Sequence, residues 1–193
     1  MDNLDAVYKY YRKVGQTILI EILVQNARQI FNSLDPSPYP EKTLDASVEA
    51  YITDAVRDFP LPSDIELVVY LPGEELQKET ESNLAQTIHN HFLYKAAQTR
   101  REMRETFASG RISLAIGISF LAMTIIANLI IAKNPDTIIH EIIRNSLLII
   151  GWVAMWQPIS LFLYAWWPIR KKVRVYQKIS TMKISCIPSE DYE

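Results

Sequence analysis

Two long stretches of the chain carry no charged residue, and they constrain its fold more than any other feature. Residues 112–132 hold 21 uncharged positions, and residues 145–169 hold 25. A helix that crosses a bilayer needs about 20 apolar residues, so each stretch is long enough for one span. The average composition, 49% hydrophobic and 22% charged, would also suit one soluble domain. The segregation of the apolar residues instead predicts a transmembrane hairpin over residues 110–169.

Positive charges flank both apolar stretches and set the expected orientation. Five precede the first stretch and five follow the second: Lys95, Arg100, Arg101, Arg104, Arg111, Arg170, Lys171, Lys172, Arg174 and Lys178. The connecting residues 133–145 hold only two cations, offset by two carboxylates. Because positively charged loops resist translocation, we expect a multi-pass protein with both termini in the cytoplasm. We also expect the ten cations to attract anionic lipid headgroups.

Aromatic and basic residues end the second apolar stretch. Trp166 and Trp167 are followed closely by Arg170, Lys171 and Lys172. Indole rings favour the headgroup region of a bilayer, and cations favour its aqueous side. These five residues are therefore predicted to anchor the second span at the interface.

Small and weakly polar residues form one stripe on each predicted span. At about 100° of rotation per residue, the two stripes consist of Ser113, Gly117, Thr124, Asn128, Gly151, Ala154 and Pro158. In lipid, helices associate through close backbone approach and interhelical hydrogen bonds, so the stripes predict the seam of the hairpin or of an oligomer. The alternative is that Ser113, Thr124 and Asn128 line a pore. Pro158, which lacks an N–H, predicts a kink.

The residues before the hairpin are predicted to form a small cytosolic αβ domain, 1–109. Strands are expected over 17–25 and 65–71, with a helix between them that has Thr43 or Asp45 as its cap. A strand, helix, strand order favours parallel pairing of the two strands. Residues 2–13 are interpreted as a helical lead-in.

A long helix is expected from Glu74 to Ser109, nearly continuous with the first span. After the hairpin, residues 170–193 form a basic helix and tail, in which a strand over 182–188 returns to the sheet. The expected fold class is thus an α/β membrane protein. A βαβ-type cytosolic domain leads through a long helix into a two-helix transmembrane hairpin.

The chain contains no recognisable catalytic motif. His89 and His91 are potential metal ligands, but residues two apart on a helix point about 200° from each other. They are therefore interpreted as structural or surface residues. With one cysteine, Cys186, no internal disulfide forms, which suits a reducing compartment. We expect no catalytic residue, metal, cofactor or nucleic-acid partner.

A proline-rich loop over residues 33–45 is the most unusual polar segment. Its prolines at 36, 38 and 40 impose a stiff, extended path. A preordered segment loses little entropy on binding, which favours a docking role for Asp35, Pro36, Ser37, Pro38 and Tyr39. The alternative is that the loop only guides the chain into the following helix.

Several stretches carry a resemblance to a known family. They are FNSLDPSPYPEKTLD, EAYI, RISLAIGISFL and GWVAMWQPISLFLYAWWPIR. Over residues 18–187 the chain resembles a widespread family of uncharacterised bacterial membrane proteins. The resemblance implies a bacterial origin and no particular activity. Similar proteins often carry Arg at the position of Gln157 and acidic residues at those of Ser160 and Ala165, so this chain departs from them toward apolarity.

The resemblance leaves two registers for the second span. If the positions of Gln157 and Ala165 tolerate charge, the span begins near Ile138 and residues 158–169 lie in the interface as an amphipathic segment. From this sequence alone, residues 146–167 serve equally well.

Function is predicted at the level of class. The first hypothesis is a non-enzymatic protein of the bacterial inner membrane, a self-associating scaffold that recruits an unidentified protein partner. The alternative is an oligomeric channel or transporter subunit with a pore lined by the polar residues of the first span. A third, an enzyme whose site forms between chains at Asp35, His89 and His91, has no support in the residue spacing.

Overall fold

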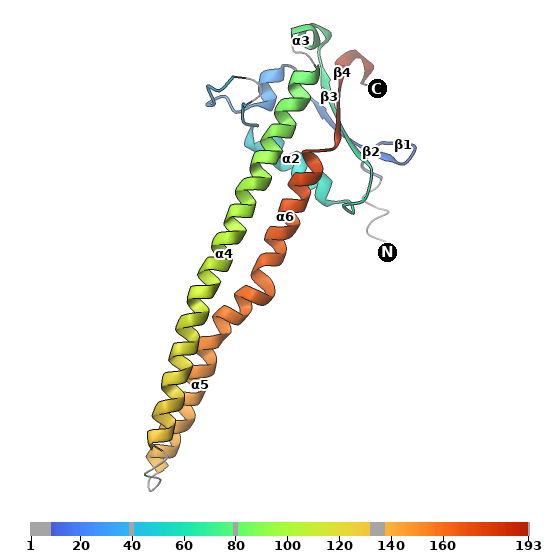
Figure 1. The fold of residues 1–193 in the computed structure, drawn as a ribbon. Helices are drawn as coiled ribbons and strands as arrows, with labels where there is room; N and C mark the ends of the chain where they lie inside the picture. Colours follow the sequence, from blue (N-terminus) through green and yellow to red (C-terminus); the bar gives the residue numbers. More distant parts are fainter. Residues whose placement is uncertain (1–8, 39–40, 79–80, 132–137, 193) are drawn as a thin grey trace. The chain divides into compact units, whose positions relative to one another are not determined.

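The computed structural model describes residues 9–38, 41–78, 81–131 and 138–192. The chain forms two compact units. The first combines Met1–Gln98 with Lys172–Glu193, and the second is Thr99–Lys171. The fold is mixed α/β, with one four-stranded sheet and two long helices (Figure 1).

The sheet of the first unit has the strand order β1-β2-β3-β4. Its strands are β1 (Lys13–Val14), β2 (Thr17–Leu23), β3 (Ile65–Leu71) and β4 (Lys183–Pro188). β2 and β4 both pair with β3 in parallel, while β1 pairs antiparallel with β2. The predicted parallel pair and the returning C-terminal strand are therefore confirmed.

The helix α2 (Ala46–Arg57) connects β2 to β3, as the apolar spacing predicts. Asp45 is its N-cap, since its carboxylate accepts a hydrogen bond from the Ser47 N–H at 2.9 Å. The short helix η1 (Ala27–Ile30) lies between β2 and α2, and η3 (Ser189–Asp191) follows β4. Ile52 and Val56 of α2 pack with Ile20 and Leu67 of the sheet in the main core.

The predicted N-terminal helix is wrong over its described part. Residues 9–12 form a turn and bend, and Lys13–Val14 form strand β1. The Gly15–Gln16 turn explains this difference, because Gly15 has a φ of 64° and lets the chain fold back onto β2. The remaining residues of the predicted lead-in, 2–8, lie outside the described part of the chain.

Two helices follow β3, and the second of them contains the first apolar stretch. α3 (Gly73–Lys78) is short, and α4 (Glu81–Ile131) has 51 residues. The predicted continuity of the cytosolic helix with the first apolar stretch is confirmed from Glu81 onward. α4 contributes Leu84, Ile88, Phe92 and Ala96 to the core of the first unit.

The second apolar stretch contains a helical irregularity just beyond Pro158, which itself lies inside a helix. α5 (Ile138–Ser160) is followed by a π-helical turn, η2 (Leu161–Ala165), and then by α6 (Trp166–Ile179). Pro158 cannot donate a backbone hydrogen bond within the helix. Beyond it, the Trp166 indole N–H donates to the Phe162 carbonyl at 2.9 Å and satisfies a group in the irregular turn.

Both long helices are long and apolar enough to cross a membrane, by length and composition. The helical segments are Asn83–Ile130 and Glu141–Ile179. In their most apolar windows of 18 residues, only 17% and 11% of the residues are buried within the protein. The core helix of a water-soluble protein would instead be mostly buried.

The unit boundaries differ from the predicted divisions at 109 and 170. The chain after the hairpin does not form a separate tail, because Val175, Tyr176 and Ile179 of α6 belong to the main core. Strand β4 then completes the sheet. The first unit is therefore assembled from both ends of the chain.

Candidate functional site

The predicted small-residue stripes meet along one seam in the second unit, where α4 and α5 lie side by side (Figure 1). A Cβ placed on Gly117 would lie 3.0 Å from the Met155 sulfur and 3.3 Å from the Ala154 carbonyl oxygen. It would also lie 3.5 Å from Cγ of Pro158. A side chain at this position would therefore require Met155 and the Ala154 carbonyl to move by a few tenths of an ångström.

The seam continues along α5 at Gly151. A Cβ there would lie 2.7 Å from the Thr124 hydroxyl oxygen and 3.0 Å from Cδ1 of Leu121. Thr124 is 2% exposed, and its hydroxyl donates to the Leu121 carbonyl at 2.8 Å. Ser113 is half-buried. The structure thus brings the two predicted stripes together within a single chain.

Asn128 occupies the same seam and is 8% exposed. Its side-chain N–H donates to the Thr124 carbonyl at 3.1 Å. Its side-chain oxygen is buried without a hydrogen-bond partner among the described residues. A buried acceptor without a partner costs desolvation free energy, so this oxygen destabilises the packed seam locally.

The predicted interface anchors have different environments. Trp167 is 63% exposed, whereas the Trp166 ring is half-buried with the Arg170 guanidinium 5.5 Å from its centroid. Lys171 is exposed and Lys172 is half-buried. Arg170 and Trp166 therefore form a cation–π pair, which holds the cation at a defined position beside the indole.

Two of the ten flanking cations have partners inside the first unit. Lys95 Nζ lies 3.0 Å from Glu49 Oε2, and Lys178 Nζ donates to the Ser63 carbonyl at 2.6 Å. These two ammonium groups make contacts within the folded first unit. Fewer than the ten flanking cations are therefore free to attract anionic lipid headgroups.

The proline-rich loop is closed at its base by Asp35. One oxygen of its carboxylate accepts from the Ser37 N–H at 2.9 Å, and the other accepts from the Thr43 N–H and hydroxyl at 2.7 and 2.6 Å. Hydrogen bonds at Ser37 and Thr43 hold the pKa of Asp35 well below its usual range. Asp35 therefore orders the loop, which leaves Pro36 and Pro38 exposed. Tyr39 lies outside the described residues.

The two histidines of the HNHF stretch bind different parts of the protein. His89 Nε2 lies 2.9 Å from the Met182 carbonyl oxygen, and His91 is buried beside α2. This is the divergence that a helix imposes on residues two apart. Among the described residues, no group of three His, Cys, Asp or Glu side chains could hold a metal ion.

A buried polar cluster centres on Glu49, which the sequence reasoning missed. The Leu44 N–H donates to Nδ1 of His91 at 3.2 Å, so Nε2 carries the proton that it donates to Glu49 Oε2 at 3.1 Å. The Tyr176 hydroxyl donates to Glu49 Oε1 at 3.3 Å. With Lys95, three side chains from α4 and α6 thus converge on one carboxylate.

The charge of Glu49 is stabilised by these donors. The hydrogen bond from His91, helped by Lys95 and opposed by burial, lowers the pKa of Glu49 to about 2. His91 and Lys95 are four residues apart and so share a helix face, which is a signal visible in the sequence. Their common partner, Glu49, lies 42 positions before His91, and nothing in the sequence indicates that pairing.

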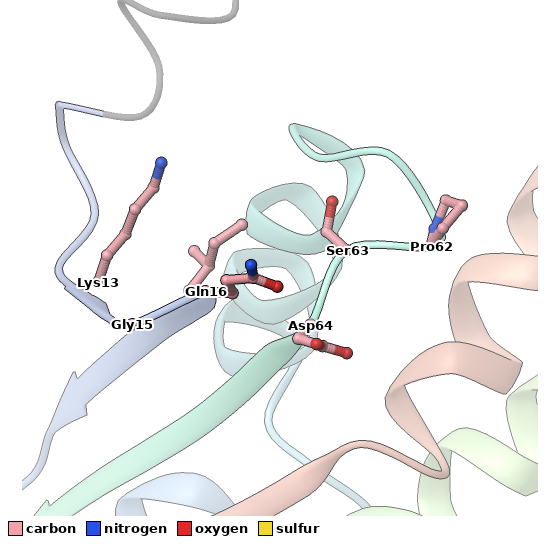
Figure 2. Close-up of a pocket in the computed structure, with 7 residues that line it drawn as sticks. Lys13, Gly15, Gln16, Pro62, Ser63 and Asp64 are labelled. Carbon is pink, nitrogen blue, oxygen red and sulfur yellow. The ribbon is translucent and has the colours of Figure 1, made fainter.

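A surface pocket of about 390 Å³ lies beside the β1–β2 turn. Figure 2 shows Lys13, Gly15 and Gln16 on one side of it, and Pro62, Ser63 and Asp64, which precede β3, on the other. The Lys13 and Ser63 side chains point the same way rather than toward each other. The backbone N–H of Ile18 donates to the Asp64 carbonyl at 2.9 Å and closes its base. This pocket has no convergent set of reactive groups.

Comparisons with protein-family models, curated proteins and solved structures found no match.

The helix seam predicts a strong effect of side-chain size at Gly151. Gly151→Leu should destabilise the packed hairpin by about 1–3 kcal/mol, because the new side chain overlaps Thr124 and Leu121. Val153→Leu is the matched control, since Val153 is 66% exposed on the same helix. Unfolding of the detergent-solubilised protein by SDS, followed by circular dichroism, measures both. Equal midpoints for the two variants would contradict the close approach.

The Glu49 cluster predicts a specific dependence of stability on acid. The pKa of Glu49 is about 2 in the folded state and 4.5 in a model peptide. Its ionised form therefore stabilises the fold fully above pH 4.5, and this contribution is lost as the pH falls toward 2. Glu49→Gln should flatten the loss of stability over that window. Glu74→Gln, at an exposed position, should retain the wild-type slope in urea unfolding; a wild-type slope for Glu49→Gln would contradict the assignment.

Proposed function

We propose that the chain is a non-enzymatic integral protein of the bacterial inner membrane, with α4 and α5 crossing the lipid as a hairpin. The exposed apolar surface of the second unit carries this proposal. Large exposed side chains include Ile112, Ile116, Ile126, Leu129, Ile130, Ile142, Ile149, Trp152, Val153 and Trp156. Water-soluble proteins rarely expose contiguous apolar patches of this kind. The polar residues Thr124 and Asn128 instead face inward.

The pairing of β3 with β4 supports a common side for both ends of the hairpin. β3 precedes α4 in the chain, β4 follows α6, and the two strands hydrogen-bond in parallel. An even number of crossings returns the chain to the side from which it left. A two-span hairpin satisfies this requirement, whereas a single crossing would separate the two strands.

The distribution of cations favours the cytoplasm for the first unit. Arg100, Arg101, Arg104 and Arg111 precede the first span, and Arg170, Lys171 and Arg174 lie just after the second. The positive-inside rule counts such residues near the ends of spans. Trp166, Trp167 and Arg170 then lie at the cytoplasmic interface.

The role proposed for the first unit is to recruit a protein partner at the membrane. Its strongest candidate surface is the proline-rich loop, in which Asp35 fixes the backbone while Leu34, Pro36 and Pro38 stay exposed. A loop that is already ordered loses little conformational entropy on docking. The chain would thus act as a scaffold rather than as a catalyst.

Self-association is part of this proposal, but it uses other surfaces than the small-residue stripes. Gly117 and Gly151 are each in contact with the facing helix of the same chain. The exposed ridge that contains Trp152 and Trp156 is the remaining candidate surface. The burial of Thr124 and Asn128 within one chain also favours a packing role for them over a pore lining.

The topology is testable with single cysteines, because the chain has only Cys186. In a Cys186→Ala background, we expect Asn134→Cys to react with an impermeant maleimide added to intact bacteria. Gln98→Cys and Thr181→Cys should react only after the inner membrane is permeabilised, since they flank the hairpin on the cytoplasmic side.

Labelling of Gln98→Cys or Thr181→Cys in intact cells would contradict the orientation. Recovery of all three variants in the soluble fraction would contradict the membrane assignment itself. A cytoplasmic protein with a native exposed cysteine serves as the control for membrane integrity.

A further inference from the structure

A pocket of about 380 Å³ lies within the first unit, between one face of α2 and residues of α4 and α6. Small-molecule sites typically span about 300–1,000 Å³, so this pocket is large enough for a small ligand. The Glu49 cluster forms part of its lining, together with Thr53, Asp54, Arg57 and Lys172. The proposed membrane function does not by itself explain why this pocket is present.

Thr53 lines the pocket with an unpartnered hydroxyl. The residue is 5% exposed, and its Oγ1 has no hydrogen-bond partner among the described residues. A hydroxyl removed from water without a partner costs free energy, so native proteins rarely leave one unpaired. The hydroxyl oxygen is closed off from solvent, so rotation of the Thr53 side chain would bring its O–H to an acceptor oxygen of a ligand in the pocket.

The pocket also contains a cation that no described carboxylate neutralises. Lys95 is paired with Glu49, and Arg57 with Asp54 at 3.3 Å. Lys172 instead lies with its Nζ 5.7 Å from the centroid of the Tyr176 ring. The lining therefore holds three cations and two carboxylates, a net charge of one positive.

We propose that this pocket binds a phosphodiester, a monoanion with several acceptor oxygens. Lys172 Nζ binds the charged phosphate, and the Thr53 hydroxyl donates to one of its oxygens. Asp54, whose side chain is 72% exposed, accepts hydrogen bonds from hydroxyl groups of an attached glycerol. A single negative charge matches the excess charge of the lining.

The same chemistry occurs in a lipid headgroup and in a soluble glycerophosphodiester. Lys172 follows Trp167 by five residues in α6, or about 7.5 Å of helical rise. An interfacial Trp167 would place a phospholipid headgroup within reach of Lys172. This choice of source rests on the proposed membrane function, whereas the phosphodiester site itself does not.

The test uses the full chain, in a phosphate-free maltoside detergent for the first arm and in nanodiscs of phosphatidylcholine for the second. One arm titrates glycerophosphoglycerol and measures binding by calorimetry. The other replaces part of the lipid with phosphatidylglycerol and measures its retention by native mass spectrometry. Binding in both arms or in either one supports the site, and retention of lipid alone identifies the membrane as the source.

Three variants distinguish specific binding in the pocket from non-specific attraction of the anionic ligand to surface cations. Lys172→Ala and Thr53→Val should each weaken binding about tenfold, the scale of one lost hydrogen bond to a charged group. Lys171→Ala, an exposed neighbour outside the lining, should change it by less than about twofold. Without ligand, Thr53→Val should unfold at the same temperature or higher, because it removes an unpaired buried hydroxyl.

Absence of binding in both arms would overturn the proposal, as would equal losses for Lys171→Ala and Lys172→Ala. Unchanged binding by Thr53→Val, with its fold intact, would do the same. Failure of the membrane assignment gives a different result, because binding of soluble glycerophosphoglycerol does not need a bilayer.

Discussion

The parallel pairing of β3 with β4 is the constraint on which the rest of the structure depends. About 110 residues separate the two strands, yet residues Glu66 to Leu71 of β3 pair with Lys183 to Pro188 in continuous register. The chain between them leaves the first unit after Gln98 and returns to it at Lys172. The long apolar hairpin is therefore an insertion within the sheet domain, and backbone hydrogen bonds join the strands β3 and β4 that precede and follow it in the chain.

The hairpin and the sheet domain differ in where they place their large apolar side chains. In the first unit, apolar side chains such as Ile20, Leu67 and Ile88 are fully buried, and Glu49 gathers the polar groups around it. In the second, small residues form the contact between helices while isoleucine and tryptophan face outward. Such an inversion suits an apolar surrounding, where close backbone contact drives association more than burial of large side chains does.

Residue periodicity predicted much of the fold because the deciding interactions are local. Strands β2, β3 and β4, α2 with its Asp45 cap and the two apolar helices all follow from spacing or from single residues. The β1–β2 hairpin was missed because one glycine, Gly15, overrides the helical appearance of the residues before it. The small-residue seam was predictable, since glycine and threonine recur on one helix face.

The Glu49 cluster and the pocket beside it could not be predicted in the same way. Glu49, His91 and Tyr176 come from three helices, and their convergence depends on how those helices pack. In the sequence Glu49 looks like an ordinary surface carboxylate of an amphipathic helix. The unpaired hydroxyl of Thr53 is equally invisible, because a sequence does not record whether a threonine has found its acceptor.

The most direct test of the central claim uses the four native tryptophans, all of which lie in residues 151–167. The chain is reconstituted in vesicles whose lipids carry bromine at defined depths, and tryptophan fluorescence is recorded for the wild type and for a Trp166→Phe, Trp167→Phe variant. If the hairpin crosses the lipid, bromine on the acyl chains quenches the Trp152 and Trp156 that remain in the variant. Bromine near the headgroups then quenches mainly Trp166 and Trp167, so it reduces the fluorescence of the wild type more than that of the variant. Fluorescence that is insensitive to bromine at every depth would contradict the account.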